Sequence, residues 1–204
     1  MRAWVPASAA LAPVVPVTAW LLAQHQQEPG YSAVRQTISV LSQPGATDRW
    51  IMTTGLFVLG ALQLATAAGL TEAPIVARIL LGIGGVATSM TAVFPQPSRA
   101  HIVAAGIAFA AFSLWPALSG LPDRRTGILA TVVTVALLVW FGSQILGGGH
   151  LGLSERVLAA FESLWPLAVV TLISVTRPLP TRATAAPRTA GTVTGRSGTP
   201  CPPR

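Results

Sequence analysis

The sequence TGILATVVTVALLVWFGSQIL, Thr126–Leu146, runs for 21 residues without a charged side chain. An α-helix rises 1.5 Å per residue, so a stretch of this length covers the roughly 30 Å hydrocarbon core of a bilayer. Five further apolar stretches of similar length occur: Val5–Gln24, Trp50–Leu70, Ile75–Phe94, His101–Ser119 and Val157–Thr176. The sequence therefore predicts an all-α fold, a polytopic transmembrane helical bundle of about six spans.

Composition supports lipid as the surroundings of these helices. The chain has 204 residues, of which 51% are hydrophobic and 9% are charged, whereas soluble domains have about 25% charged residues. A helix that is apolar all round belongs in a membrane or a large core, and a chain of this length cannot bury six of them in a soluble core. The prolines and the length of Val5–Gln24 favour an uncleaved first span over a signal peptide.

The net charge of +7 comes from arginines that stand singly at span ends or lie in the C-terminal tail. They form no basic face interleaved with aromatic residues, so no nucleic-acid partner is expected. Cytoplasmic loops retain positive residues. This rule assigns to the cytoplasm Arg2, Arg78, Arg124, Arg125 and the arginines from Arg177 onward, and to the outside Arg35, Arg49, Arg99 and Arg156. We expect a bacterial cytoplasmic (inner) membrane protein with both termini in the cytoplasm.

Two regions follow from this pattern: residues 1–176 as the six-span domain, and residues 177–204 as a basic cytoplasmic tail. The tail is rich in Pro, Thr, Ala, Gly and Arg, so we expect it to be disordered. It carries the single cysteine, Cys201, which can form no internal disulfide. The longest connection, His25–Arg49, falls on the outer side, and the short ones make consecutive helices antiparallel neighbours.

Small residues at four-residue spacing mark candidate packing faces, because helices in lipid associate by close approach. These residues are Ala61, Ala65 and Gly69 in the second span, Gly85 and Ser89 in the third, and Ala100, Ala104 and Ala108 in the fourth.

Ionisable residues inside spans are costly, so each calls for a reason. Glu162 lies about two turns into the sixth span, and His101 opens the fourth. Glu155 and Glu162 are seven residues apart and therefore share one helical face. The expected topology places seven polar side chains on the outer side, where they would form a cup facing away from the cytoplasm: His25, Glu28, Tyr31, His101, His150, Glu155 and Glu162.

Three interpretations of this cup are open. In the first, the residues simply lie at the membrane–water interface. In the second, they form a structural network, such as Glu162 bonded to His101 or to an arginine. In the third, they bind a metal, a proton or a small ligand. The histidine spacings typical of metal sites and the common catalytic motifs are missing. We therefore assign no metal, cofactor or catalytic residue. A cup requires that His101, Glu155 and Glu162 face the inside of the bundle.

Several short motifs point to one family. The first loop reads YSAVRQTISVL (residues 31–41), Phe94-Pro95 precedes His101, and GLSER (residues 152–156) is followed by LWP (residues 164–166). Over roughly residues 5–176 the chain resembles the prokaryotic membrane family called domain of unknown function 998. The resemblance implies a polytopic inner-membrane protein with a long first outer loop and carries no activity. The family's recurring features would include Tyr31, Arg35, Ser39, His101, Glu155 and Arg156. Together with Glu162, these are the candidate ligand-binding residues.

Three functions remain in view. The first is a non-enzymatic membrane protein that binds a lipid, a small ligand or a partner through the cup. The second is a small transporter or permease-like protein with Glu162 as a proton or cation site. The third is a membrane enzyme or redox protein acting on a lipid-soluble substrate, with His101 and Glu155 as acid and base.

Overall fold

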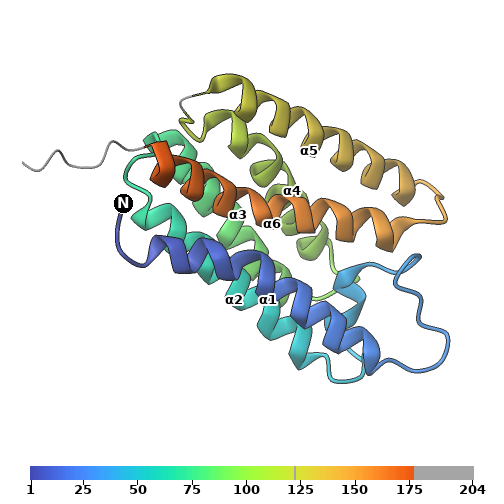
Figure 1. Cartoon of the computed structure of the whole chain (residues 1–204). Coiled ribbons are helices and arrows are strands. Elements are labelled where there is room, and N and C mark those ends of the chain that lie inside the picture. Colours follow the sequence, from blue (N-terminus) through green and yellow to red (C-terminus); the bar gives the residue numbers. More distant parts are fainter. Residues whose placement is uncertain (122, 177–204) are drawn as a thin grey trace, which may run out of the picture.

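The computed structural model describes residues 1–121 and 123–176, and every regular element in this part is helical (Figure 1). The six long helices are α1 (Val5–His25), α2 (Trp50–Gly69), α3 (Ile75–Val93), α4 (Arg99–Leu118), α5 (Arg124–Ile145) and α6 (Leu151–Thr176). A short 3-10 helix, η1 (Ile38–Ser42), interrupts the first connection. All six α-helices are long and apolar enough to cross a membrane. The predicted six-span all-α fold is confirmed, whereas the expected disordered tail and Cys201 lie outside the described residues.

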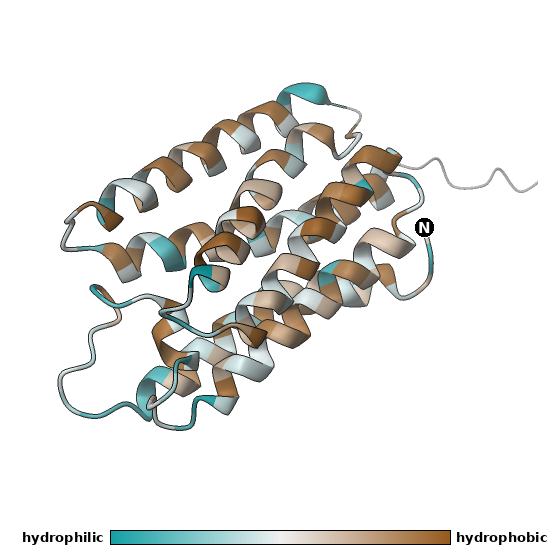
Figure 2. Cartoon of the chain, turned by 180° about the vertical axis from the view of Figure 1, so that it is seen from behind, coloured by the Kyte–Doolittle hydropathy of each residue, from teal (hydrophilic) through white to brown (hydrophobic). Residues whose placement is uncertain are grey.

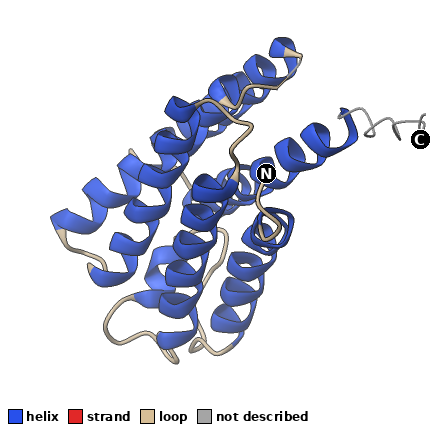
Figure 3. Ribbon diagram, turned by 90° about the vertical axis from the view of Figure 1, so that its left-hand side faces the viewer, coloured by secondary structure: helices blue, strands red, loops and turns tan. Residues whose placement is uncertain are grey.

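The helices run antiparallel in sequence order, so the N-terminus and the end of α6 lie at the same end of the bundle (Figures 1 and 3). We call this the terminal end, and the opposite end, which carries residues 26–49, the loop end. Helices α1, α2, α3, α4 and α6 enclose the interior. Helix α5 packs on the outside against α4 and α6, and of its residues only Gly127, Ala130 and Thr134 are buried.

Hydrophobic residues run along the helices, while many hydrophilic residues lie in the connections (Figure 2). Many of the large apolar side chains on the helices are exposed. Ile79, Val132 and Val139, for example, are each more than half exposed. In water, an exposed apolar surface of this extent would mark an interaction site or cause aggregation. In a bilayer it is the surface that contacts lipid, as expected for a multi-pass membrane protein.

Inside the bundle, two apolar clusters divide the length of the helices. The terminal half is packed around Leu70, Leu81, Phe112, Trp115 and Val169. The loop half has a smaller cluster around Trp20, Ala23, Ile38, Leu41 and Met52. The terminal half is therefore filled mainly by apolar side chains, apart from a few buried hydroxyls such as those of Ser8 and Thr66, which hydrogen-bond to each other at 2.8 Å.

Helices α2 and α3 approach each other closely at their glycines. A Cβ atom at Gly60 would lie 2.5 Å from the Gly85 carbonyl oxygen and 2.2 Å from Ser89 Oγ, so only glycine fits. The predicted Gly85 and Ser89 face is confirmed. The predicted face of α2 is wrong at its first position, because Ala61 is exposed and its neighbour Gly60 points at α3.

Candidate functional site

The first connection folds back onto the bundle instead of standing away from it. Residues 31–42, which we call the loop plug, include η1 and lie across the loop end. Ile38 and Leu41 are only 5% and 0% exposed, because they pack among Trp20 and Met52. The plug therefore closes the loop end of the interior with side chains that belong to the apolar core.

Helix α6 holds this plug through Arg156. Its Nη1 donates hydrogen bonds to the carbonyl oxygens of Ala33 at 2.8 Å and Gln36 at 2.9 Å, and its Nη2 donates to the Tyr31 hydroxyl at 2.5 Å. These contacts extend α6 beyond the range predicted from the sequence. The helix begins at Leu151, six residues before the predicted start at Val157, because the polar residues near its start pair with the plug.

The plug and the first turn of α6 touch at Gly152. A Cβ atom there would lie 2.0 Å from the Gln36 carbonyl oxygen and 2.5 Å from that of Ala33. The next residue, Leu153, donates its backbone N–H to the Val34 carbonyl oxygen at 3.0 Å. The contact is thus made backbone to backbone, with no room for a side chain at position 152.

Tyr31 and Glu155 complete the attachment. Burial raises the pKa of the Tyr31 phenol, and the positive charge of Arg156 opposes this rise without cancelling it. The Glu155 carboxylate accepts a hydrogen bond from the backbone N–H of Ile38 in η1. Glu155 therefore connects the plug to the space beneath it.

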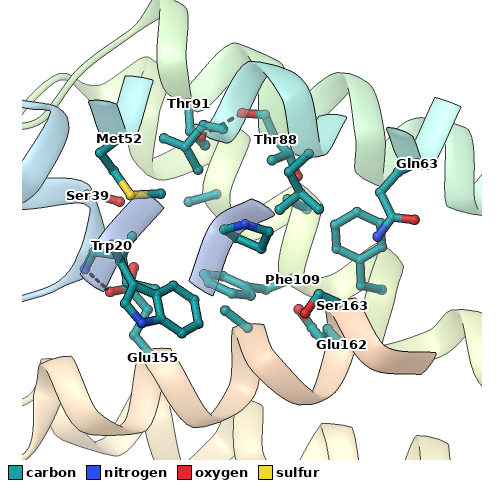
Figure 4. Close-up of a pocket in the computed structure, with 18 residues that line it drawn as sticks. Trp20, Ser39, Met52, Gln63, Thr88, Thr91, Phe109, Glu155, Glu162 and Ser163 are labelled. Atoms are coloured by element: carbon teal, nitrogen blue, oxygen red, sulfur yellow. Dashed lines mark hydrogen bonds between the residues drawn. The ribbon is translucent and has the colours of Figure 1, made fainter. Parts of the chain in front are cut away.

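Beneath the plug lies a cavity of about 70 Å³, which we call the chamber (Figure 4). Side chains from α1, α2, α3, α4, α6 and η1 form its wall. Three aromatic rings contribute, from Trp20, Phe109 and Phe112. The polar part of the wall consists of Ser39, Gln63, Thr88, Thr91, Glu155, Glu162 and Ser163.

Hydrogen-bond acceptors dominate this polar wall. The hydroxyls of Thr88, Thr91 and Ser163 donate to helix carbonyl oxygens at 2.9, 2.7 and 2.9 Å. Each hydroxyl hydrogen is thereby used, and the oxygen keeps its lone pairs as acceptors. The buried Oε1 of Gln63 receives no hydrogen bond from any described residue. The remaining side-chain donors on the wall are those of Trp20, Gln63 and Ser39.

Two buried carboxyl groups add to these acceptors. Glu155 and Glu162 are each 4% exposed, and Glu162 Oε1 accepts a hydrogen bond from Ser113 Oγ at 2.8 Å. Among the residues that the structure describes, neither carboxyl group forms an ion pair. The ion pair found among the described residues joins the N-terminal amine of Met1 to Glu72 at the terminal end. An uncompensated charge is energetically unfavourable at this depth, so a proton or a cation must neutralise Glu162, whereas the neighbouring charge of Arg156 partly offsets that of Glu155.

The prediction that His101, Glu155 and Glu162 face the inside of the bundle is confirmed, since they are 2%, 4% and 4% exposed. His101 nevertheless lies apart from the chamber wall. Its Nδ1 donates to the carbonyl oxygens of Thr91 at 3.2 Å and Phe94 at 2.8 Å, which fixes the start of α4 against the end of α3. A hydrogen bond between Glu162 and His101 was one form of the structural network considered from the sequence. The carboxyl group of Glu162 instead accepts its hydrogen bond from Ser113.

The seven-member cup does not form as one site. His25, Glu28 and His150 are exposed, as is the candidate Arg35. Tyr31 and Arg156 attach the plug, whereas Ser39, Glu155 and Glu162 line the chamber. Sequence reasoning missed Ser113 and Thr88. Gln63 was likewise not among the candidate site residues, and the presence of a polar residue within an apolar span was the one available signal.

One further observation concerns metal binding. Within residues 1–121 and 123–176, no three His, Cys, Asp or Glu side chains gather where they could hold a metal ion. The fold and the site define a multi-pass helical membrane protein with a small, acceptor-rich chamber beneath a docked loop.

The chain belongs to the protein family of unknown function DUF998, whose family model matches residues 10–172. The match takes in the plug, the chamber and parts of all six helices. It confirms the resemblance found in the sequence. No curated protein and no solved structure matches the chain.

Proposed function

We propose that this protein binds a small cation of the ammonium type in the chamber, with Glu162 as the principal ligand. The observation that carries the proposal is the chemistry of the wall. Two buried carboxyl groups without an ion-pair partner face a space whose other polar groups are mainly acceptors. A ligand with a positive charge and N–H donors matches such a wall.

The size and the aromatic lining of the chamber support the same ligand class. Its volume of about 70 Å³ is several times the roughly 10–15 Å³ that a cavity needs in order to hold one water molecule. This space suits ammonium, methylammonium or a monovalent metal ion. The rings of Trp20, Phe109 and Phe112 also line it, and a desolvated cation near such a face gains about 2 kcal/mol.

The arrangement along the bundle favours binding from the loop end over passage through the protein. Glu155 lies directly beneath the plug, and Glu162 follows seven residues later, roughly 10 Å deeper along α6. Beyond them, the apolar cluster around Trp115 and Val169 fills the terminal half. A transporter would have to open this cluster. An enzyme with His101 and Glu155 as acid and base gains no support, because His101 does not share the chamber.

We place the protein in a bacterial cytoplasmic membrane with both termini in the cytoplasm, so that the chamber opens outward. The arginine distribution supports this orientation, as does the position of the N-terminus and the end of α6 at the same end of the bundle. Labelling of single cysteines with a membrane-impermeant reagent in intact cells tests it. A cysteine at Arg35 should react and one at Arg78 should not, and the reverse pattern would overturn the orientation.

The binding proposal is tested with the purified chain in lipid nanodiscs by thermal unfolding against ammonium, methylammonium and potassium chloride. Saturable stabilisation is expected, reaching about 2.7 kcal/mol at a concentration 100 times the Kd. Glu162→Gln should abolish it, because glutamine keeps an acceptor for Ser113 but lacks the charge. Glu28→Gln, at an exposed carboxylate of the loop end, is the matched control.

Two results would overturn the proposal. One is equal salt response in the parent protein, Glu162→Gln and Glu28→Gln. The other is stability that depends on pH but on none of the cations, which would show that protons alone neutralise the chamber.

A further inference from the structure

A second hollow lies on the lipid-facing side of the bundle and shares no residue with the chamber. It is a groove of about 790 Å³ between α3 and α4, with Leu64 of α2 at one side. This volume falls within the 300–1,000 Å³ that small-ligand sites usually have. Its floor is made by small residues, among them Gly82, Ala87 and Ala104. The groove exists because these small side chains keep the space between the two helices open.

The groove has the length of one leaflet. On α3 it extends from Gly82 to Phe94, which at 1.5 Å per residue is roughly 18 Å. Half of the bilayer hydrocarbon is roughly 15 Å thick. The groove ends at the loop end, where polar lipid headgroups would begin. A chain entering from that interface would therefore reach about the middle of the membrane.

Its lining is apolar apart from one residue, Arg99, at the loop end. Arg99 is exposed, and no described residue forms an ion pair or a side-chain hydrogen bond with it. The chain has six acidic residues, and none of them lines the groove. Arg99 is also the first residue of α4, where the helix dipole adds partial positive charge.

We propose that this groove holds one acyl chain of an anionic phospholipid from the loop-end leaflet, with the lipid phosphate on Arg99. The guanidinium fork binds a phosphate through two hydrogen bonds. The apolar trough below it takes the hydrocarbon chain. The combination of a leaflet-long apolar groove with a single cation at the interface end selects a lipid over a partner helix.

The test measures lipids retained by the purified full-length chain in native mass spectrometry. The protein is equilibrated with equal amounts of phosphatidylglycerol and phosphatidylcholine that carry the same acyl chains. We expect about fivefold preference for phosphatidylglycerol, the ratio for ~1 kcal/mol from one interfacial arginine. Arg99→Gln should remove the preference. Arg49→Gln, which removes an exposed arginine at the same end, should preserve it.

A second pair of variants probes the apolar part. A Cβ atom at Gly82 would meet only Leu64 and Ala67, both at 3.9 Å, which is ordinary contact. Gly82→Leu should therefore fold, fill the deep end of the groove and lower retention of both lipids. Gly106→Leu, which points into open space on α4, is its control.

Equal retention of the two lipids by the parent protein would overturn the proposal. So would equal losses in Arg99→Gln and Arg49→Gln, because general surface charge would then explain the preference. A mass spectrum dominated by lipid-free dimers would assign the groove to a second copy of the chain instead.

Discussion

Replacing Gly152 with alanine should detach the loop plug from α6, although alanine is the better helix former. The gain in helix propensity is about 1 kcal/mol. Against it stands a Cβ atom 2.0 Å from the Gln36 carbonyl oxygen and 2.5 Å from that of Ala33. Both oxygens belong to backbone, so the whole plug must move away to make room.

The cost of that movement follows from the hydrogen bonds it breaks. Arg156 donates to Ala33 and Gln36 through charged groups, and Leu153 donates to Val34. With about 1.5 kcal/mol for each charged bond and about 1 kcal/mol for the neutral one, these three bonds alone represent a loss of about 4 kcal/mol, and the bonds of Tyr31 and Ile38 to α6 add to it. Subtracting the helix gain leaves at least about 3 kcal/mol, or a shift of the docking equilibrium of at least roughly 150-fold.

Hydrogen exchange in nanodiscs measures this shift. The backbone N–H of Ile38 is buried and bonded to Glu155, and it should exchange at least roughly 150-fold faster in Gly152→Ala under conditions where opening and closing are fast relative to chemical exchange. Gly149→Ala is the control, because a Cβ atom there meets no atom within 4 Å. Exchange at Ile38 that is unchanged or slower in Gly152→Ala would refute the reasoning.

Two other predictions concern packing and pH. Gly60→Leu should lower the thermal unfolding temperature, because the new side chain forces α2 away from Gly85. Gly142→Leu, where a Cβ atom meets open space, should leave that temperature unchanged. Equal unfolding temperatures for the two variants would contradict the packing argument. Tyr31, the one tyrosine in the chain, should ionise with a pKa above its ordinary 10.0, because burial outweighs the opposing charge of Arg156. The contribution of the Tyr31 hydroxyl to the free energy of plug docking should be present below pH 10 and be lost as the pH rises through that elevated pKa. Ultraviolet titration reports this ionisation, and a pKa at or below 10.0 would refute it.

The spans were predictable because lipid imposes a simple requirement, about 20 apolar residues per crossing. The start of α6 was not, because Glu155 and Arg156 look like residues of an aqueous connection. Both residues instead form hydrogen bonds with a segment more than 110 residues earlier in the chain, Ala33–Ile38. The local sequence does not contain that pairing, so no reading of residues 147–156 alone could place the start at Leu151.

The candidate site could be predicted from the sequence only in part. The seven-residue spacing placed Glu155 and Glu162 on one face, and helical geometry alone guarantees this. Their partners depend on how the other helices rotate against α6. Packing of glycines such as Gly60 and Gly85 sets the approach of α2 and α3, and so contributes to bringing Gln63 and Thr88 to the chamber. The helix rotation is a property of the whole bundle, which is why these residues could not be singled out.

Part of the attachment of the plug does not depend on the side chains of the plug. Helix α6 recognises carbonyl oxygens at positions 33, 34 and 36 and the amide at position 38, atoms that nearly every amino acid supplies. Proline at position 38 is the exception, since it lacks the N–H. Substitutions at positions 33, 34 and 36 could therefore keep the same docked shape, whereas the side chain of Ile38 is buried in the core. The exposed rim around Arg35 could likewise be redecorated, for example with an epitope, without loosening the closure beneath it.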